Sequence, residues 1–345
     1  MGARSACQIF EKVSDALLWI LKTRYGISNV VKVLDDFLFI EKSREQCLHA
    51  LQSFKEICQL TGFPLAEHKT VPPTTSLTFL GLTIDTTSQE ASLPQDKVNA
   101  YSSAAEALLT LSHCSLRQLK SVIGQLQFAC SVIPSGRCFL RRLHNLTSHK
   151  NNPNSLIPIP PWAKEDLSLW ISFLSRFNGR ALYNFAWLGD SSSTHFYSDS
   201  SKTGYGGTFF SHYIQGTFPP SWQQLNITFL ELYPIFLLVK IFAHTIPNSH
   251  LLFHCDNEAV VHILNNKTSK DKLIMTLVRP LVLCLMSHNI IFRARHIPGL
   301  YNIVPDFLSR SQATPQFLRS NGLDPLPTPV PASLRPTNLR ISLDP

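Results

Sequence analysis

Four acidic residues in the second half of the chain occupy separate apolar settings: Asp199 in HFYSDSS, Glu231 in FLELY, Asp256 in LLFHCDNEAVV and Asp306 in NIVPDFLSR. Three of the four follow or interrupt apolar runs, where an ionised carboxylate is costly to bury without a partner. One such carboxylate is explained by a strand end that reaches solvent. Four in one stretch, with His296 shortly before the last, instead predict a metal cluster.

The apolar pattern from residue 194 onward predicts an α/β layout with a mixed sheet. Strand-like and helix-like spacings follow one another in the order strand, strand, strand, helix, strand, helix, helix, strand, helix. The ranges are 194–199, 205–211, 212–218, 228–244, 250–255, 257–265, 271–287, 289–295 and a short helix from 305.

On this layout Asp199 ends the first strand, Glu231 lies in the first turn of the next helix, and Asp256 ends the fourth strand. If the first and fourth strands are parallel neighbours, Asp199 and Asp256 meet at their C-terminal ends, where sites in such sheets form. Asp306 then begins the last helix. Clustered carboxylates repel one another unless a proton or a cation neutralises them. Two Mg²⁺ ions about 4 Å apart would do so and would activate water for in-line attack on phosphate.

Purely structural explanations exist for three of the acids. Asp256, followed by Asn257, is a candidate helix N-cap. Glu231 is a favourable negative charge near a helix N-terminus. Asp306 follows Pro305, and helix N-terminal placement explains both residues. Asp199 has no such local explanation.

The bulk composition predicts two or three domains, because 345 residues is too long for one ordinary domain. The net charge of +8 fits a phosphate-bearing partner. Eight cysteines form no CxxC or Cys/His zinc pattern and are expected to be reduced and mostly buried, as in an intracellular protein of the cytoplasm or nucleus. Neither a signal peptide nor a run of about 18 apolar residues is present, so no membrane partner is expected. The chain enters a helical pattern almost at once, which predicts a fragment of a longer polyprotein.

The first half alternates helical and strand-like segments. Helical spacing covers 5–24 and 43–61, and NVVKVLDDFLFIEK (29–42) predicts a hairpin with Asp35 and Asp36 at its tip. Strands are expected around 77–84, followed by a turn at 85–92, and helices at about 115–131, 135–147 and 163–177. Residues 148–163, rich in Pro and Asn, predict a linker, and residues 311–345, with seven prolines, predict a largely disordered tail.

Residues 194–310 resemble a ribonuclease H domain of the retrotransposon type. The resemblance rests on FYSDSSKTGYGG, NITFLELYPI, HCDNEAVVHILNN and RHIPGLYNIVPDFLSR, in that order. It implies that Asp199, Glu231, Asp256 and Asp306 hold two Mg²⁺ ions, with Mn²⁺ as a substitute, and that Asn257 contacts substrate. It also implies that His296 assists turnover near the leaving product, although a His before Pro-Gly is also an ordinary loop residue.

The first half resembles a reverse transcriptase entered partway through. GARSACQIFEKV (2–13), VLDDFLFI (33–40), GFPLAEHKT (62–70) and FLGLTID (79–85) are similar to motifs B, C, D and the primer grip. The resemblance implies that Asp35 and Asp36 are catalytic, metal-binding carboxylates and that Lys69 lies near the phosphates. A surface hairpin turn and a solvated lysine are the structural alternatives.

The resemblance divides the chain into a partial palm (1–113), thumb-like helices (114–150), a linker or connection (151–193), a ribonuclease H-like domain (194–310) and the tail (311–345). The fold class is therefore α/β and α+β, multidomain. Basic residues of the thumb-like helices are expected to grip the duplex backbone, with a solvated helix face as the alternative. They are Arg117, Lys120, Arg141 and Arg142.

The expected activity is two-metal hydrolysis of the RNA strand of RNA–DNA hybrids. The arrangement is most similar to DIRS-type retroelements, and it implies an RNA template, a DNA primer and other parts of a polyprotein as partners. Two alternatives stay open: a catalytically degenerate nucleic-acid-binding protein, and an integrase- or transposase-type nuclease.

Three features depart from the family pattern. Val33 replaces the usual aromatic residue of motif C. Pro234 lies three residues after Glu231 and is expected to kink the helix or cost ~3 kcal/mol. No motif A aspartate is present, so we expect the RNA-directed DNA polymerase activity implied by the family to be incomplete.

Overall fold

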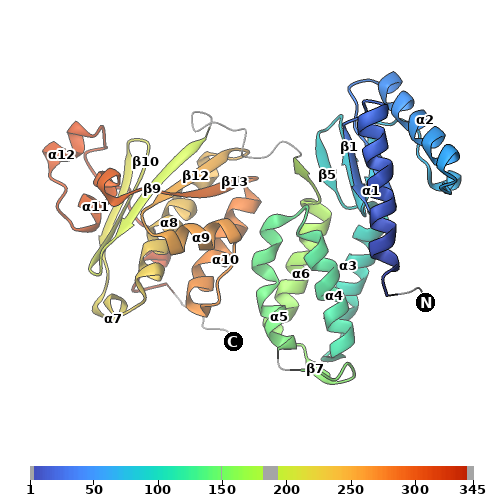
Figure 1. Ribbon diagram of the computed structural model, residues 1–345. Coiled ribbons are helices and arrows are strands. Elements are labelled where there is room, and N and C mark those ends of the chain that lie inside the picture. The colour runs from blue at the N-terminus through green and yellow to red at the C-terminus, as the bar shows by residue number, and fades with distance from the viewer. Residues whose placement is uncertain (1–3, 149, 182–192, 340–345) are drawn as a thin grey trace. The chain divides into compact units, whose positions relative to one another are not determined.

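The computed structural model describes residues 4–148, 150–181 and 193–339, and the chain divides into two compact units, Met1–Pro94 and Gln95–Pro345 (Figure 1). The division falls earlier than residue 113, where the sequence motifs suggest that the palm-like part ends. A helix that the sequence pattern did not predict, α3 (Gln95–Leu109), explains the difference, because it packs against helices α4 and α6 of the second unit.

The first unit packs two helices against a hairpin. Leu17 and Leu21 of the first helix meet Phe54 and Ile57 of the second in its buried core. The second helix begins at Ser43, whose side chain accepts a hydrogen bond from the Gln46 amide, and ends at a left-handed glycine. The elements are α1 (Ala6–Arg24), β1 (Val30–Val33), β2 (Asp36–Phe39), α2 (Arg44–Thr61), the 3₁₀ turn η1 (Glu67–Lys69), β3 (Ser76–Phe79), β4 (Leu82–Asp85) and β5 (Glu90–Ser92).

The second unit begins with a helical part. Its elements are α3, β6 (His113–Ser115), α4 (Leu116–Ala129), η2 (Pro134–Phe139), α5 (Arg141–Thr147), β7 (Leu156–Pro158), α6 (Pro161–Arg176) and β8 (Arg180–Ala181). The linker predicted at 148–163 is instead integrated into this part, since β7 pairs with β6 and α6 packs on α3. Buried Ile157 and Ile159 hold the proline-rich stretch in place. Residues 149 and 182–192 of the predicted linker or connection lie outside the described residues.

A five-stranded mixed sheet follows, as the sequence pattern predicted. Its strand order is β11-β10-β9-β12-β13, with β12 parallel to both β9 and β13. The predicted parallel pairing of the first and fourth strands is thereby confirmed. The elements are β9 (Thr194–Ser200), β10 (Gly204–Phe209), β11 (His212–Thr217), α7 (Pro220–Gln223), α8 (Ile227–Phe242), η5 (Ala243–Thr245), β12 (His250–Cys255), α9 (Glu258–Asn266), α10 (Lys272–Ser287), β13 (Ile291–His296), η6 (Gly299–Tyr301) and α11 (Ile303–Ser309).

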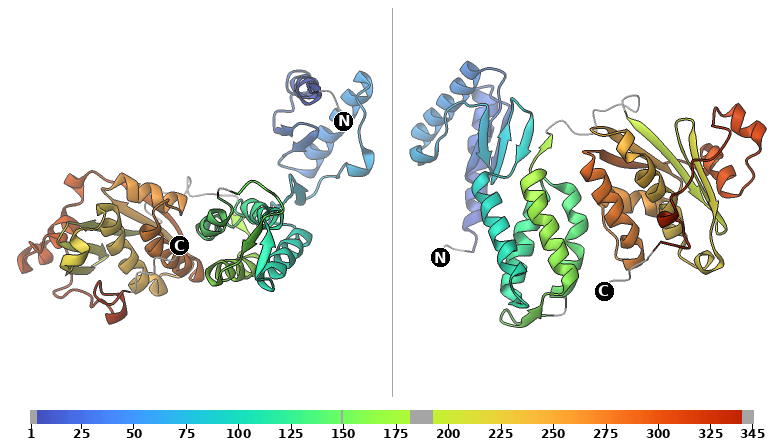
Figure 2. Two further views of the ribbon diagram at one scale, coloured as in Figure 1. Left: turned by 90° about the horizontal axis from the view of Figure 1, so that it is seen from below. Right: turned by 180° about the vertical axis from the view of Figure 1, so that it is seen from behind.

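Helices cover both faces of this sheet (Figure 2). A Cβ added at Gly207 would meet the Leu238 side chain of α8 at 2.9 Å, which places α8 against one face. A Cβ added at the neighbouring Gly206 would lie 2.8 Å from the Pro305 carbonyl and 2.9 Å from the Ser309 amide, which places α11 against the other. The glycine pair therefore lets both helices approach β10 closely.

Helix α8 is the core helix of this domain and is buried almost all round. Among the described helices, the stretch Ile227–Thr245 alone is long and apolar enough to cross a membrane. However, 72% of its most apolar 18 residues are buried inside the protein. Such burial is typical of a core helix.

The proline-rich end of the chain is ordered up to residue 339, contrary to the prediction of a disordered tail. It forms α12 (Pro315–Ser320) and a 3₁₀ turn, η7 (Ala332–Leu334). The Thr328 amide donates to the Tyr213 carbonyl of β11, and the Tyr233 hydroxyl donates to the Leu334 carbonyl. Buried Leu318 and Leu323 anchor the segment beside Leu308 of α11. The composition did not reveal this order, because a few apolar side chains are enough to hold a proline-rich segment against the domain. Residues 340–345 lie outside the described residues.

Candidate active site: a cluster of four carboxylates

The four acidic residues singled out in the sequence come from four elements around the C-terminal ends of β9 and β12. Asp199 is the penultimate residue of β9, and Asp256 directly follows β12. Glu231 lies one turn into α8, slightly later than predicted, and Asp306 lies in the first turn of α11. Electrostatic repulsion links all four, because Asp199, Asp256 and Asp306 each raise the pKa of Glu231.

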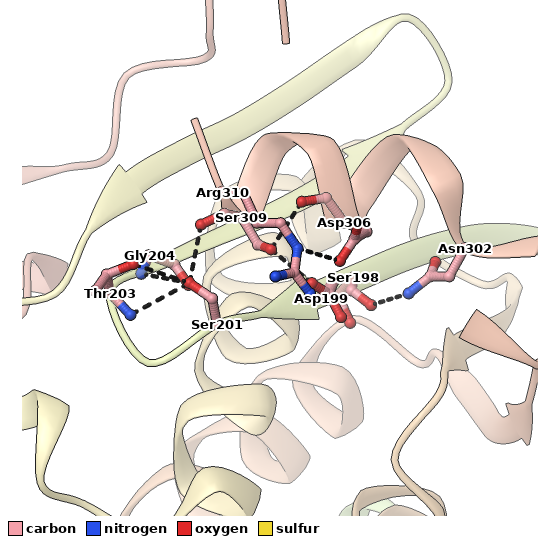
Figure 3. Close-up of polar contacts among 9 residues, drawn as sticks. All are labelled: Ser198, Asp199, Ser201, Thr203, Gly204, Asn302, Asp306, Ser309 and Arg310. Atoms are coloured by element: carbon pink, nitrogen blue, oxygen red, sulfur yellow. Dashed lines mark hydrogen bonds and ion pairs between the residues drawn. The ribbon is translucent and has the colours of Figure 1, made fainter. Parts of the chain in front are cut away.

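Asp199 is held by the α11 helix that also carries Asp306 (Figure 3). The Ser309 hydroxyl donates to Asp199 Oδ2 at 2.6 Å, and both side chains are buried. The pKa of Asp199 is raised to about 6, chiefly by burial; the Ser309 hydrogen bond opposes this shift, and the charges of Asp256 and Asp306 contribute to it. On the same strand, the Asn302 side chain donates to the Ser198 carbonyl at 2.9 Å and fixes the start of α11.

Asp306 is paired with a cation that the sequence motifs did not single out. Arg310 Nε donates to Asp306 Oδ1 at 2.7 Å across one helical turn. The carboxylates in turn raise the pKa of the Arg310 guanidinium. Arg310 therefore supplies a positive charge at the edge of the acidic cluster.

Glu231 is, with Asp199, one of the two most deeply buried members of the cluster. Its side chain is 6% exposed, and its Oε2 atom has no hydrogen-bond partner within the described part of the chain. Burial, followed by repulsion from Asp199 and Asp256, raises the pKa of Glu231 to about 9, although the Ser200 backbone amide opposes the shift. A buried carboxyl group with an unpartnered oxygen is a site that a cation would satisfy.

Asp256 is framed by the strand end and by the loop that follows β13. The exposed His296 side chain contacts the Asp256 carbonyl through Nε2 at 3.1 Å. A Cβ at Gly299 would lie 3.2 Å from Asp256 Oδ2, so this loop passes close to the carboxylate. Asn257, not Asp256, is the N-cap of α9, because its Oδ1 accepts from the Ala259 and Val260 amides. The structural alternative for Asp256 is therefore excluded by the structure.

Pro234 lies inside α8, which continues unbroken from Ile227 to Phe242. A proline at this position leaves the carbonyl four residues earlier, that of Leu230, without its helical donor. The Ser200 hydroxyl on β9 donates to this carbonyl at 2.8 Å. The β9 strand that carries Asp199 thus supplies the missing hydrogen bond.

The residues singled out in the first half do not join a comparable cluster. Asp35 and Asp36 are exposed at the β1–β2 turn, which confirms the predicted hairpin, and Lys69 is exposed in η1. Within the described ranges, the group Glu231, Cys255 and Asp256 alone brings three potential metal-ligand atoms within 4.8 Å of one another.

The basic residues predicted to grip a duplex fall into two sets. Arg117 and Lys120 are exposed on α4, and Arg141 is partly buried at the start of α5. Arg142 is instead committed to the protein interior, which corrects its prediction as a substrate contact. Its guanidinium donates to both carboxylate oxygens of fully buried Asp166, at 2.9 and 2.8 Å, and Arg279 of α10 pairs with the same carboxylate.

Sequence reasoning missed the residues that support the four acids. These are Ser200, Ser309 and Arg310. The spacing of Arg310 four residues after Asp306 is a helical ion-pair signal in the sequence. The two serines carry no such signal, because their partners lie far away in the chain.

Comparisons with known proteins give limited likenesses. No protein-family model matches the chain. The chain is 25% identical over 176 residues, 51% of its length, to the Gag-Pro-Pol polyprotein of bovine leukemia virus (isolate Australian), and it spans 12% of that polyprotein.

The solved structures similar to the chain align with it at low sequence identity and at TM-scores below 0.5. A foamy viral protease-reverse transcriptase in complex with RNA/DNA hybrid aligns at TM-score 0.45 and 15% identity, covering 82% of this chain and 37% of that one. RNase H1 from Halobacterium salinarum NRC-1 aligns at TM-score 0.29 and 14% identity, covering 35% of this chain and 96% of that one. The assignment of a function therefore depends on the site itself.

Proposed function

We propose that the chain is part of a retroelement reverse transcriptase/ribonuclease H and hydrolyses the RNA strand of RNA–DNA hybrids at the four-carboxylate cluster. The observation that carries the proposal is the convergence of Asp199, Glu231, Asp256 and Asp306 at neighbouring parallel strand ends. This sheet edge is where α/β proteins place their sites.

The donor set fits Mg²⁺, which prefers oxygen ligands from one or two carboxylates and keeps several waters. Asp199, Glu231, Asp256 and Asp306 would hold two such ions, and Mn²⁺ is a chemically similar substitute. The unpartnered buried oxygen of Glu231 and the raised pKa values of Glu231 and Asp199 are properties that a dication would reverse. When bound, the ions would supply an activated water and neutralise charge on the phosphate.

The protein side chains have separable roles in this proposal. Ser309 orients the Asp199 carboxylate, and Arg310 holds Asp306 toward the cluster edge. His296, which is exposed and contacts the Asp256 carbonyl, would assist departure of the cleaved strand. Asn257 caps α9 through its oxygen and leaves its amide group as the candidate substrate contact.

We further propose that the exposed Arg117 and Lys120 contact the duplex backbone, together with Arg141. Asp35, Asp36 and Lys69 are the residues that a polymerase function would use, with an RNA template and a DNA primer. The order of the sequence motifs favours a DIRS-type element as the subtype.

Asp256→Asn tests the proposal most directly. Asparagine keeps the shape of the side chain and leaves the Asn257 cap intact, but it removes a negative charge that a hard dication needs. Single-turnover cleavage of a labelled hybrid in Mg²⁺ should fall by at least about a hundredfold, because charge stabilisation in the transition state is lost.

Thermal melts of parent and variant, and a reaction in EDTA, are the controls. Without metal the variant should melt no lower than the parent, since it carries one fewer repelling charge. A variant that cleaves like the parent contradicts the proposed site. If both proteins are folded and inert, the chain is a degenerate nucleic-acid-binding protein instead.

A further inference from the structure

One neighbour of the cluster is chemically unlike the four carboxylates. Cys255, the last residue of β12, is fully buried, and its Sγ lies within 4.8 Å of ligand oxygens of both Glu231 and Asp256. The proposed Mg²⁺ chemistry does not use this thiol, because Mg²⁺ takes oxygen ligands. A sulfur and two carboxylate oxygens are instead a donor set for zinc-like ions.

The geometry suits such an ion after small movements. Zinc binds sulfur at about 2.3 Å and carboxylate oxygen at about 2.0–2.2 Å, so tetrahedral donors lie roughly 3.6 Å apart. The three donor atoms already lie within 4.8 Å of one another, and two of them belong to adjacent residues. Side-chain rotation of Asp256, which is only partly buried, can close the remaining distance.

Two further observations point to a ligand at this place. The Glu231 side chain is more than nine-tenths buried, and its Oε2 has no hydrogen-bond partner in the described ranges. The Asn257 backbone amide donates to Cys255 Sγ at 3.4 Å, which orients the sulfur and partly opposes the burial that raises the pKa of the thiol.

We propose that Glu231, Cys255 and Asp256 form a site for a thiophilic divalent cation, Zn²⁺ or Cd²⁺, which excludes Mg²⁺ from the shared carboxylates. On binding, a metal–sulfur bond forms and the thiol proton is released to solvent, without any redox change. The binding site stands on its own contacts, while the inhibition it predicts depends on the proposed nuclease function.

Cobalt is the spectroscopic probe for this site. Co²⁺ added to the whole chain should give a thiolate-to-cobalt charge-transfer band in the near ultraviolet, and Zn²⁺ should abolish the band by displacement. Cys255→Ser should lose the band and bind Zn²⁺ at least about tenfold more weakly in equilibrium dialysis, since a ligand is lost. Cys284→Ser is the matched control, because Cys284 lies beside His288 at 4.0 Å, outside the cluster.

The outcomes separate the two proposals. A band that survives in Cys255→Ser, or that disappears in Cys284→Ser, overturns the site. Should Cys255→Ser fail to fold, Glu231→Gln, which keeps every thiol, should weaken zinc binding, and unchanged affinity overturns the site. Zinc should inhibit Mg²⁺-supported cleavage by the parent at concentrations that do not inhibit cleavage by the folded Cys255→Ser protein. If the parent shows no cleavage at all, the nuclease proposal fails while the cobalt spectrum still decides the metal site.

Discussion

At the scale of single residues, the buried acids of the cluster have properties that the proposed Mg²⁺ ions would reverse. Glu231 and Asp199 lie near two other acids, Asp256 and Asp306. Neither Glu231 nor Asp199 forms an ion pair with a cationic side chain in the described part of the chain. Burial, together with repulsion from the other acids, raises the pKa of Glu231 to about 9 and that of Asp199 to about 6, so at neutral pH Glu231 keeps its proton while Asp199 is largely ionised. Mg²⁺ would have to displace the Glu231 proton in order to bind to that carboxyl group.

This arrangement predicts how stability depends on pH. Glu231 has a higher pKa in the folded protein than its ordinary value of 4.5, so the folded state binds the proton more tightly than the unfolded state. Its stabilising effect is fully present below pH 4.5 and is lost as pH rises toward 9. Without metal, the melting temperature should therefore fall across this window, and added Mg²⁺ should raise it most at the alkaline end.

Glu231→Gln is the control for that prediction, since glutamine keeps the shape but does not titrate. Melting temperatures measured by calorimetry from about pH 5 to about pH 9 should depend less on pH in the variant than in the parent. Equal slopes in the two proteins would show that Glu231 is not the responsible group.

The sequence reveals the acids but not their supports, for a physical reason. A carboxylate beside an apolar run is conspicuous because its burial is costly, so Asp199, Glu231 and Asp256 can be found from local pattern. Ser309 is an ordinary polar residue until the fold brings it to Asp199, 110 positions away in the chain. Partner identity at that separation is a tertiary property, and no local pattern encodes it.

At the scale of elements, a hydrogen bond from β9 replaces one that α8 lacks. Pro234 removes the helical donor of the Leu230 carbonyl, and Ser200 replaces it. Ser200→Ala would leave a buried acceptor unsatisfied and should lower the free energy of unfolding by about 1–3 kcal/mol. In a Pro234→Ala background the helix regains its own donor, so the same substitution should cost under about 1 kcal/mol.

Urea denaturation of the four proteins of this double-mutant cycle measures the coupling. Ser287→Ala is a suitable control, because the Ser287 hydroxyl also donates to a helical carbonyl, that of Cys284, but is exposed. An equal cost of Ser200→Ala in both backgrounds would refute the compensation.

Element boundaries were predictable where periodicity and caps agree, and not where proline dominates the composition. α2 and the β1–β2 hairpin lie where the sequence pattern placed them, with Ser43 and Gly62 marking the helix ends. The proline-rich stretches at 148–163 and 311–345 were assigned by composition alone. Proline favours extended backbone, which pairs or packs as readily as it stays free when a few apolar side chains anchor it.

At the scale of the whole molecule, the net charge of +8 predicts salt-sensitive binding to a hybrid. Affinity should fall steeply with salt concentration and depend little on base sequence. Replacing Arg117 and Lys120 with Ala should flatten the plot of log affinity against log salt by about 0.7–0.9 for each phosphate that is no longer neutralised. Fluorescence anisotropy at several salt concentrations measures the slope. The double variant Lys240→Ala, Arg319→Ala removes the same charge and should leave the slope unchanged. Equal flattening of the slope in the two double variants would refute the proposal that α4 contacts the phosphates.

The division of the chain into two compact units predicts that the proposed nuclease activity can be separated from the first unit. All four acids, the supporting Ser200, Ser309 and Arg310, and the ordered tail belong to Gln95–Pro345, so every residue described at the cluster lies in this one unit. A compact unit with its own core is expected to fold alone. Residues 95–345 expressed by themselves should therefore show Mg²⁺-dependent cleavage of a labelled hybrid, and Asp256→Asn in the same fragment should abolish it. Residues 1–94 should not cleave the hybrid under the same conditions. A fragment 95–345 that melts cooperatively but has lost the cleavage shown by the whole chain would mean that the first unit contributes to the active site.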